Sequence, residues 1–227
     1  MSDSNEPADS TGQEMFPPVP QAKLSEQIRP AILSVLVLTL LCGCGFPCLL
    51  FAITWPLFPR QTGGSLIMRG GAVIGSDLIG QQFTRPEYFQ SRPSAAGAGY
   101  DGTSSGGTNL GPNNPKLKSG AADFAGIRQL AAEYRTQNGL RADAPIPIDA
   151  VTRSGSGLDP HITPANAALQ IRRVARARGL SEEAVRRRVA DHTEGRQFGF
   201  LGSPRVPVLE LNLALDQMQQ GGPSTSH

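Results

Sequence analysis

The stretch Ala31 to Phe58 reads AILSVLVLTLLCGCGFPCLLFAITWPLF and contains no charged residue. It is about 28 residues long, and a helix needs about 20 apolar residues to cross the hydrocarbon core of a bilayer. Pro30 suits a first helical turn, Pro47 should kink the middle, and Trp55 marks the far interface. The sequence therefore predicts one transmembrane helix over residues 30–58.

Three other interpretations explain this stretch less well. It is too long for a buried core helix, and a cleaved signal peptide would need a shorter apolar run and a small-residue cleavage site. Leu41-Cys42-Gly43-Cys44 resembles a lipidation signal, but the apolar run continues well past Cys44. The three cysteines of the chain, Cys42, Cys44 and Cys48, are therefore interpreted as small apolar helix residues, which excludes a disulfide scaffold and a cysteine zinc site.

Composition changes sharply on either side of the apolar stretch. The 227 residues include 26 Gly and 19 Pro, 18% are charged, and the net charge is +2. These averages exclude a polytopic membrane protein, a coiled coil and a strongly basic nucleic-acid-binding protein. Residues 1–29 are acidic and lack periodic apolar positions, so we expect a disordered tail there. Residues 59–218 should form one small soluble α+β domain with long Gly-rich loops, and residues 219–227 a second disordered tail.

Charge does not decide on which side of a membrane this domain lies. Lys23 and Arg29 flank one end of the apolar stretch, and Arg60 and Arg69 flank the other. The positive-inside rule therefore gives a tie, and long domains can be translocated whatever their charge.

Strand and loop signals occur in three parts of the soluble region. Residues 65–76 alternate around Gly70-Gly71, which predicts a β-hairpin. Residues 86–115 form a long Gly-rich loop, which we expect to be ordered because Tyr88, Phe89 and Tyr100 can anchor it. Residues 206–213 alternate apolar side chains and predict a strand.

Helix signals are local and specific. Apolar residues at three- and four-residue spacing predict a helix over 121–138, with Gly139 as its stop. Thr163 followed by Pro164 predicts the start of a helix that runs to Arg178. Ser181, followed by two acidic residues, predicts the start of another helix.

Candidate chemistry is sparse. Ser156, Asp159 and His161 lie close together in sequence and allow a serine hydrolase as an alternative, but no GxSxG elbow surrounds the serine. The Gly-rich loops lack the phosphate-binding patterns GxxxxGK[ST] and GxGxxG. No two histidines are spaced to ligate a metal, so we expect no metal site.

Arginines cluster in two groups that could contact nucleic acid or anionic lipid, namely Arg172, Arg173, Arg176 and Arg178, and Arg186, Arg187 and Arg188. Acidic residues are interleaved with them and no aromatic platform accompanies them, which favours a solvated helix face or a contact with an acidic partner. The residues alone thus indicate a membrane anchor carrying a small domain without a catalytic constellation, as in an accessory subunit.

Five motifs, in order, resemble the C subunit of the bacterial Kdp potassium-transporting ATPase. They are residues 80–89 (GQQFTRPEYF), 92–96 (RPSAA), 105–112 (SGGTNLGP), 154–162 (SGSGLDPHI) and a C-terminal pair, 204–206 (PRV) with 211–216 (LNLALD). The resemblance covers almost everything from about Pro30 to Asp216. Pro207 departs from it, because an Asn is usual there, and a proline removes a ladder donor and weakens the case for a central strand.

The resemblance implies a single-pass inner-membrane protein with a cytoplasmic N-terminus and a periplasmic domain. Its implied partners are a channel-like potassium-conducting subunit, a P-type ATP-hydrolysing subunit and a small single-helix subunit, besides membrane lipid. The role it implies is a catalytic chaperone that raises the ATP affinity of the hydrolysing subunit through a ternary complex, with no cofactor of its own. A periplasmic cap on the potassium-conducting subunit is the alternative, because ATP is cytoplasmic.

The same resemblance suggests site residues within these motifs, and one, Tyr100, between two of them. Candidate nucleotide contacts are Gln81, Ser105, Gly106 and Gly107. Candidate partner contacts are Arg92, Tyr100, Asn109, Asp159 and His161. No catalytic residue and no metal ligand is expected.

Overall fold

The computed structural model describes residues 23–220, which form two compact units, one ending at Thr62 and the other beginning at Gly63. Most of the two expected tails, residues 1–22 and 221–227, lies outside the described residues. Residues 24–29 and 219–220, which we expected to be disordered, are helical, because α1 begins at Leu24 and the last helix ends at Gln220. The helices therefore extend six residues into the predicted N-terminal tail and two residues into the predicted C-terminal tail.

The first unit is one long apolar helix. It consists of α1 (Leu24–Leu38), a π-helical segment (Thr39–Gly45) and α2 (Phe46–Leu57), followed by the short α3 (Pro59–Thr62). The helix from Leu24 to Leu57 has 34 residues, about 50 Å at 1.5 Å per residue. It is long and apolar enough to cross a membrane.

The two prolines act differently from the prediction. Pro30 lies inside α1 and not in its first turn, because the helix starts at Leu24. We expected Pro47 to kink the helix. The structure instead has a π-helical segment that ends at Gly45, two residues before Pro47, and Phe46 N donates to Leu41 O. Pro47 has no N–H to offer Gly43 O, and a π turn is a common way for a helix to accommodate such a gap.

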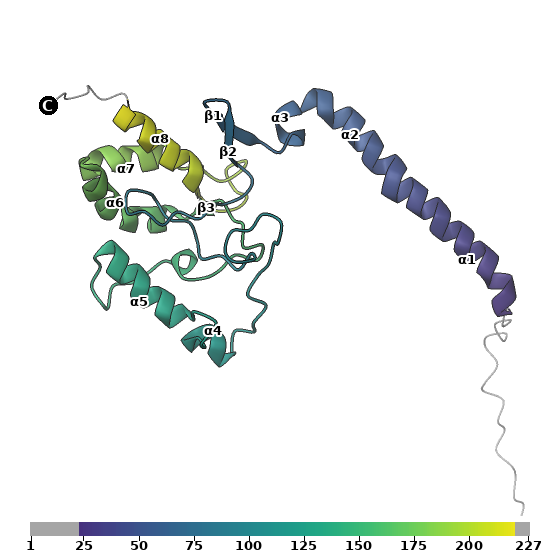
Figure 1. Ribbon diagram of the computed structural model, residues 1–227, viewed down its shortest axis with the longest axis horizontal. Helices are drawn as coiled ribbons and strands as arrows, with labels where there is room; N and C mark the ends of the chain where they lie inside the picture. Colours follow the sequence, from purple (N-terminus) through teal and green to yellow (C-terminus); the bar gives the residue numbers. More distant parts are fainter. Residues whose placement is uncertain (1–22, 221–227) are drawn as a thin grey trace, which may run out of the picture. The chain divides into compact units, whose positions relative to one another are not determined.

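The second unit is an α+β domain, as predicted, with little β-structure (Figure 1). Strands β1 (Leu66–Arg69) and β2 (Ala72–Ser76) form the expected antiparallel hairpin. Gly70 and Gly71 both have positive φ, 59° and 82°, as a two-residue type I′ turn requires. A second, minimal antiparallel pair joins β3 (His161–Ile162) to β4 (Val206–Pro207).

Helices supply most of the core. In chain order they are α4 (Pro115–Ser119), α5 (Ile127–Asn138), α6 (Pro164–Arg178), α7 (Glu182–Asp191) and α8 (Val208–Gln220), with a 3₁₀ turn at Ile148–Ala150. From α5 to α8, each helix contacts the next. The predicted caps are confirmed: Thr163 accepts from Asn166 N, Ser181 accepts from Ala184 N, and Gly179 follows α6 with φ 66°.

Two element predictions need correction. The helix expected over 121–138 begins only at Ile127, where Gly126 N donates to Gln129 Oε1. The strand expected over 206–213 has two residues, after which the chain is helical. The buried positions Val208, Leu211 and Leu215 have helical spacing, and this helical period overrides the apparent alternation.

Candidate functional site

Side chains of α6 and α8 bind the backbone of segment 86–90. They make the hydrogen bonds that a neighbouring strand would make in a sheet. Asn212 on α8 accepts from Phe89 N at 2.8 Å and donates to Phe89 O at 2.9 Å. Gln170 on α6 does the same for Gln90, at 2.8 Å and 3.1 Å. Both backbone groups of each residue are therefore satisfied, and the Phe89 side chain is fully buried in the core between these helices.

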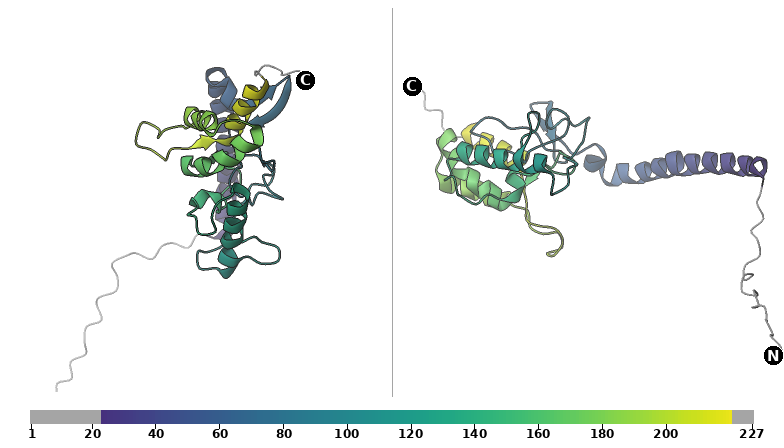
Figure 2. Two further views of the ribbon diagram at one scale, coloured as in Figure 1. Left: turned by 90° about the vertical axis from the view of Figure 1, so that its left-hand side faces the viewer. Right: turned by 90° about the horizontal axis from the view of Figure 1, so that it is seen from below.

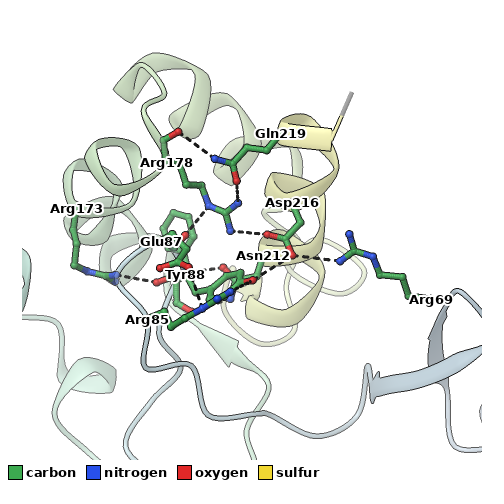
Figure 3. A network of polar contacts seen from close by, with 10 residues as sticks. Arg69, Arg85, Glu87, Tyr88, Arg173, Arg178, Asn212, Asp216 and Gln219 are labelled. Carbon is green, nitrogen blue, oxygen red and sulfur yellow. Dashed lines mark hydrogen bonds and ion pairs between the residues drawn. The ribbon is translucent and has the colours of Figure 1, made fainter. Parts of the chain in front are cut away.

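Arginines of α6 complete this arrangement (Figure 3). The fully buried Arg178 side chain donates from Nε to Glu87 O at 2.6 Å, from Nη1 to Gln219 Oε1 at 2.8 Å and from Nη2 to Asp216 Oδ1 at 2.9 Å. Its guanidinium also lies 5.1 Å from the ring centre of Tyr88. Each of the three guanidinium nitrogens of the buried cation thus has a partner, as burial of a charge requires.

Arg173 adds two more bonds to the same segment, from Nη1 to Pro86 O at 2.6 Å and to Tyr88 O at 2.9 Å. We call Gln170, Arg173, Arg178 and Asn212 the clamp. The prediction that these arginines form a solvated face is wrong for Arg173 and Arg178, whereas Arg172 and Arg176 are exposed. The helices therefore fix the last part of the motif at residues 80–89, from Pro86 onward, in position.

A small charged cluster forms around Asp159, which contacts His161 and also Arg92, a residue just after the clamped segment in the chain. Arg92 Nη1 lies 2.7 Å from Asp159 Oδ2, and His161 Nδ1 lies 3.4 Å from Asp159 Oδ1. His161 N also donates to Asp159 Oδ1 at 3.0 Å. Burial raises the pKa of Asp159, but the hydrogen bonds from His161 and the Arg92 guanidinium outweigh it and lower this pKa to about 2.

Hydrogen bonds to backbone carbonyls join the two loops that carry the SGG and SGSG motifs. Ser94 Oγ donates to Gly157 O at 2.6 Å, and Gly106 N donates to Ser156 O at 2.9 Å. Ser105 Oγ donates to the same Ser156 carbonyl at 3.0 Å. We call the joined loops, residues 91–107 and 154–161, the loop cluster.

Glycines make this close approach possible. Gly157 has φ 71°, and a Cβ there would lie 2.6 Å from both Ala96 N and Gly106 O. A Cβ on Gly107 would lie 2.7 Å from Gly155 O. These glycines therefore serve loop-to-loop packing, because the backbones meet where a side chain would stand.

Tyr100 connects the loop cluster to a pocket. Its hydroxyl donates to Arg92 O, and burial raises the pKa of this phenol to about 12. A pocket of about 380 Å³ lies beside it. Its polar lining includes Gln90, Ser91, Arg92, Ser94, Tyr100 and Tyr134.

The candidate nucleotide contacts fall into two separate settings. Gln81 Nε2 donates to Ile74 O at 2.7 Å and so braces the hairpin. Ser105 and Gly106 donate to Ser156 O as described, and Gly107 packs against Gly155. None of the four lines the 380 Å³ pocket.

The candidate partner contacts are mostly gathered in one place. Arg92, Tyr100, Asp159 and His161 belong to the loop cluster, where all four are partly exposed. Asn109 lies just beyond it, exposed and with φ 51°. Positive φ suits asparagine better than other non-glycine residues.

The serine hydrolase arrangement is incomplete. His161 contacts Asp159, but Ser156 Oγ accepts from Leu158 N at 3.1 Å, and within residues 23–220 no hydrogen bond joins it to His161. Among the same residues, no group of three or more His, Cys, Asp or Glu side chains is placed to hold a metal ion.

An apolar helix long enough to cross a membrane, followed by a small α+β domain whose ordered loops carry its motifs, is consistent with a single-helix membrane subunit. Residues 28–217 match the KdpC family, described as K+-transporting ATPase, c chain. This chain belongs to that family and is an accessory subunit of a potassium-transporting ATPase.

Relatives from distant bacteria match over nearly their whole length. A potassium-transporting ATPase KdpC subunit of Koribacter versatilis is 50% identical over 86% of this chain and 97% of the relative. The corresponding subunit of Sorangium cellulosum is 54% identical over 83% of this chain and 96% of the relative. That of Mycobacterium tuberculosis is 47% identical over 86% of this chain and 100% of the relative.

Proposed function

We propose that this chain is a non-catalytic docking subunit of an ATP-driven potassium uptake complex, and that its loop cluster binds the potassium-conducting subunit. The loop cluster is the observation that carries the proposal. It combines motif residues from two distant parts of the chain into one hydrogen-bonded surface with partly exposed charged and polar side chains. A surface that is ordered before binding loses little conformational entropy when a partner docks.

The same contacts weigh against a nucleotide cradle at the SGG motif. A phosphate-binding loop presents several free backbone N–H groups to the anion. Here Gly106 N and Ser105 Oγ are both directed to Ser156 O. Gln81 is engaged with the hairpin. ATP would have to displace these bonds, so docking is favoured over a chaperone role that requires nucleotide contact by these residues.

The anchor gives the proposal its topology. In our proposal the helix from Leu24 to Leu57 crosses the inner membrane once, with the N-terminus in the cytoplasm and the domain in the periplasm. The domain would then lie on the side from which potassium enters, and ATP on the other. A cap on the potassium-conducting subunit is consistent with this, and the hydrolysing and small single-helix subunits would complete the complex.

Two measurements on the full-length chain test the proposal. Tagged protein extracted from its native membrane should copurify with a channel-like and a P-type ATPase subunit; recovery of a stable, partner-free monomer would contradict it. Purified alone in lipid nanodiscs, the chain should show no saturable ATP binding by calorimetry. ATP binding that is lost in Ser105→Ala but kept in the nearby Ser104→Ala control would instead support the chaperone role.

A further inference from the structure

A narrow arm, residues 194–205, projects from the domain between α7 and β4 (Figure 2). At its base Glu194 and Arg205 exchange both backbone hydrogen bonds, at 2.9 and 3.0 Å, and their side chains form an ion pair of 2.7 Å. Near its end Gln197 and Leu201 exchange two more, at 3.0 and 2.9 Å. The arm is thus closed at two levels and presents a defined tip, residues 198–201.

The tip consists of apolar side chains that the domain does not cover. Phe198 is 86% exposed, Phe200 68% and Leu201 47%. Phe198 also has φ 52°, a left-handed conformation that is unusual for a bulky residue and suits glycine. Neither packing within the domain nor backbone preference accounts for an aromatic residue at this position.

Charge at the tip has one sign. Residues 195–204 contain Arg196 and no acidic residue. The Arg196 side chain is exposed and forms no ion pair or hydrogen bond within the described part of the chain. Exposed phenylalanines beside an uncompensated cation match the membrane interface, where apolar rings enter the acyl boundary and a guanidinium meets lipid phosphates.

The anchor keeps this tip near a bilayer. Only residues 58–62 separate the end of α2 from the start of the domain at Gly63. A domain of roughly 160 residues has a radius of gyration of about 15 Å. With the helix in a bilayer as proposed, the short connection would keep the domain within a few nanometres of the lipid headgroups, so shallow insertion would need no encounter from bulk solution.

We propose that the tip of the arm, Phe198 to Leu201, inserts into the lipid interface and that Arg196 contacts anionic headgroup phosphates, which gives the domain a second membrane contact besides its helix. The inference rests on the proposed membrane anchoring. It does not depend on docking to the potassium-conducting subunit.

Spin-label accessibility in the full-length chain tests this inference. All native cysteines lie at Cys42, Cys44 and Cys48, so a variant with alanine at these three positions can carry a single label at Phe198→Cys or Phe200→Cys. Ile148→Cys is the matched control, because Ile148 is an apolar residue that is 70% exposed elsewhere on the domain. A label on Cys44 alone, with the other two cysteines replaced by alanine, reports whether the helix itself is in the bilayer.

The proteins are reconstituted without partners in nanodiscs of equal parts phosphatidylcholine and phosphatidylglycerol. We expect the ratio of oxygen accessibility to nickel-chelate accessibility to be several-fold higher at positions 198 and 200 than at 148. Arg196→Gln should lower this ratio, and so should pure phosphatidylcholine.

Equal ratios at the tip and at position 148 would overturn the inference, and so would protection of the tip from both reagents, which indicates contact with protein. In nanodiscs of the same composition, a high ratio of oxygen to nickel-chelate accessibility at Cys44 shows that the helix is in the bilayer. A negative result at the tip then counts against insertion of the tip and not against the anchor.

Discussion

Asn212 binds both backbone groups of Phe89, a residue 123 positions earlier in the chain. This pair joins the motif at residues 80–89 to the motif at residues 211–216, which explains why both occur in one domain. Asn212 is 1% exposed and Phe89 is fully buried, so water cannot replace either hydrogen bond.

Asn212→Ala should therefore lower the free energy of unfolding of the domain by about 3 kcal/mol, because two buried backbone groups lose their partners. Denaturant unfolding of the full-length chain in detergent, followed by circular dichroism, measures the change. Gln217→Ala is the matched control on the same helix, since Gln217 is exposed. Equal stability of the two variants would show that the clamp is dispensable.

Arg178 should not be replaceable by lysine. Its three bonds to Glu87 O, Gln219 and Asp216 leave in different directions from one planar group, which an ammonium cannot reproduce. We expect Arg178→Lys and Arg178→Gln each to cost about 3 kcal/mol or more of stability in the same unfolding assay. Arg176→Gln, which removes an exposed charge from the same helix, should change stability by less than about 0.5 kcal/mol. A fully stable Arg178→Lys would contradict this account.

Two glycines of the SGSG motif offer a sharper comparison. Gly157→Ala places a methyl group 2.6 Å from Ala96 N and Gly106 O at a φ of 71°. It should destabilise the domain by about 3 kcal/mol through backbone strain and overpacking. Gly155→Ala finds open space and should be nearly neutral. If both variants unfold alike, the close approach of the two loops is not a requirement of the fold.

Acid should weaken the loop cluster in a defined pH range. The pKa of Asp159 falls from its ordinary 3.8 to about 2 in the folded protein, so the folded state holds on to fewer protons than the unfolded state between these values. The resulting stabilisation, at most about 2 kcal/mol for this partly solvent-screened carboxylate, is complete above about pH 5 and is lost as the pH falls through about 2. Unfolding free energies measured across this range should show the loss in the original chain and in an Asp143→Asn control. Asp159→Asn should show a smaller acid dependence, and an unchanged one would contradict the assignment to Asp159.

Local signals in the sequence predicted much of the fold. Thr163, Ser181 and the Gly70-Gly71 turn act on their immediate neighbours, so their effect can be read from a few residues. Residues 208–213 were misassigned because alternating apolar residues in a short run fit a strand as well as one face of a helix. Only contact with the rest of the core decides between them.

The clamp could not be predicted from local patterns. Gln170, Arg173, Arg178 and Asn212 act on backbone groups 80 or more residues away, and a polar residue on a helix gives no sign of such a partner. The structure brings together Arg92, Tyr100, Asp159 and His161, four of the five residues expected to contact a partner, and that contact stays a prediction. The use of Ser105 and Gly106 as donors to Ser156 is visible only in three dimensions.

Photocrosslinking from the edge of the loop cluster tests the central claim most directly. The photoreactive amino acid p-benzoylphenylalanine, placed at the exposed Asn109 of the full-length chain, is activated in native membranes, with Arg141, which is also exposed, as the control position. We predict a covalent adduct with the potassium-conducting subunit from position 109 and none from position 141, identified by mass spectrometry of the adduct. An adduct with the ATP-hydrolysing subunit alone, or no adduct from position 109, would contradict the account.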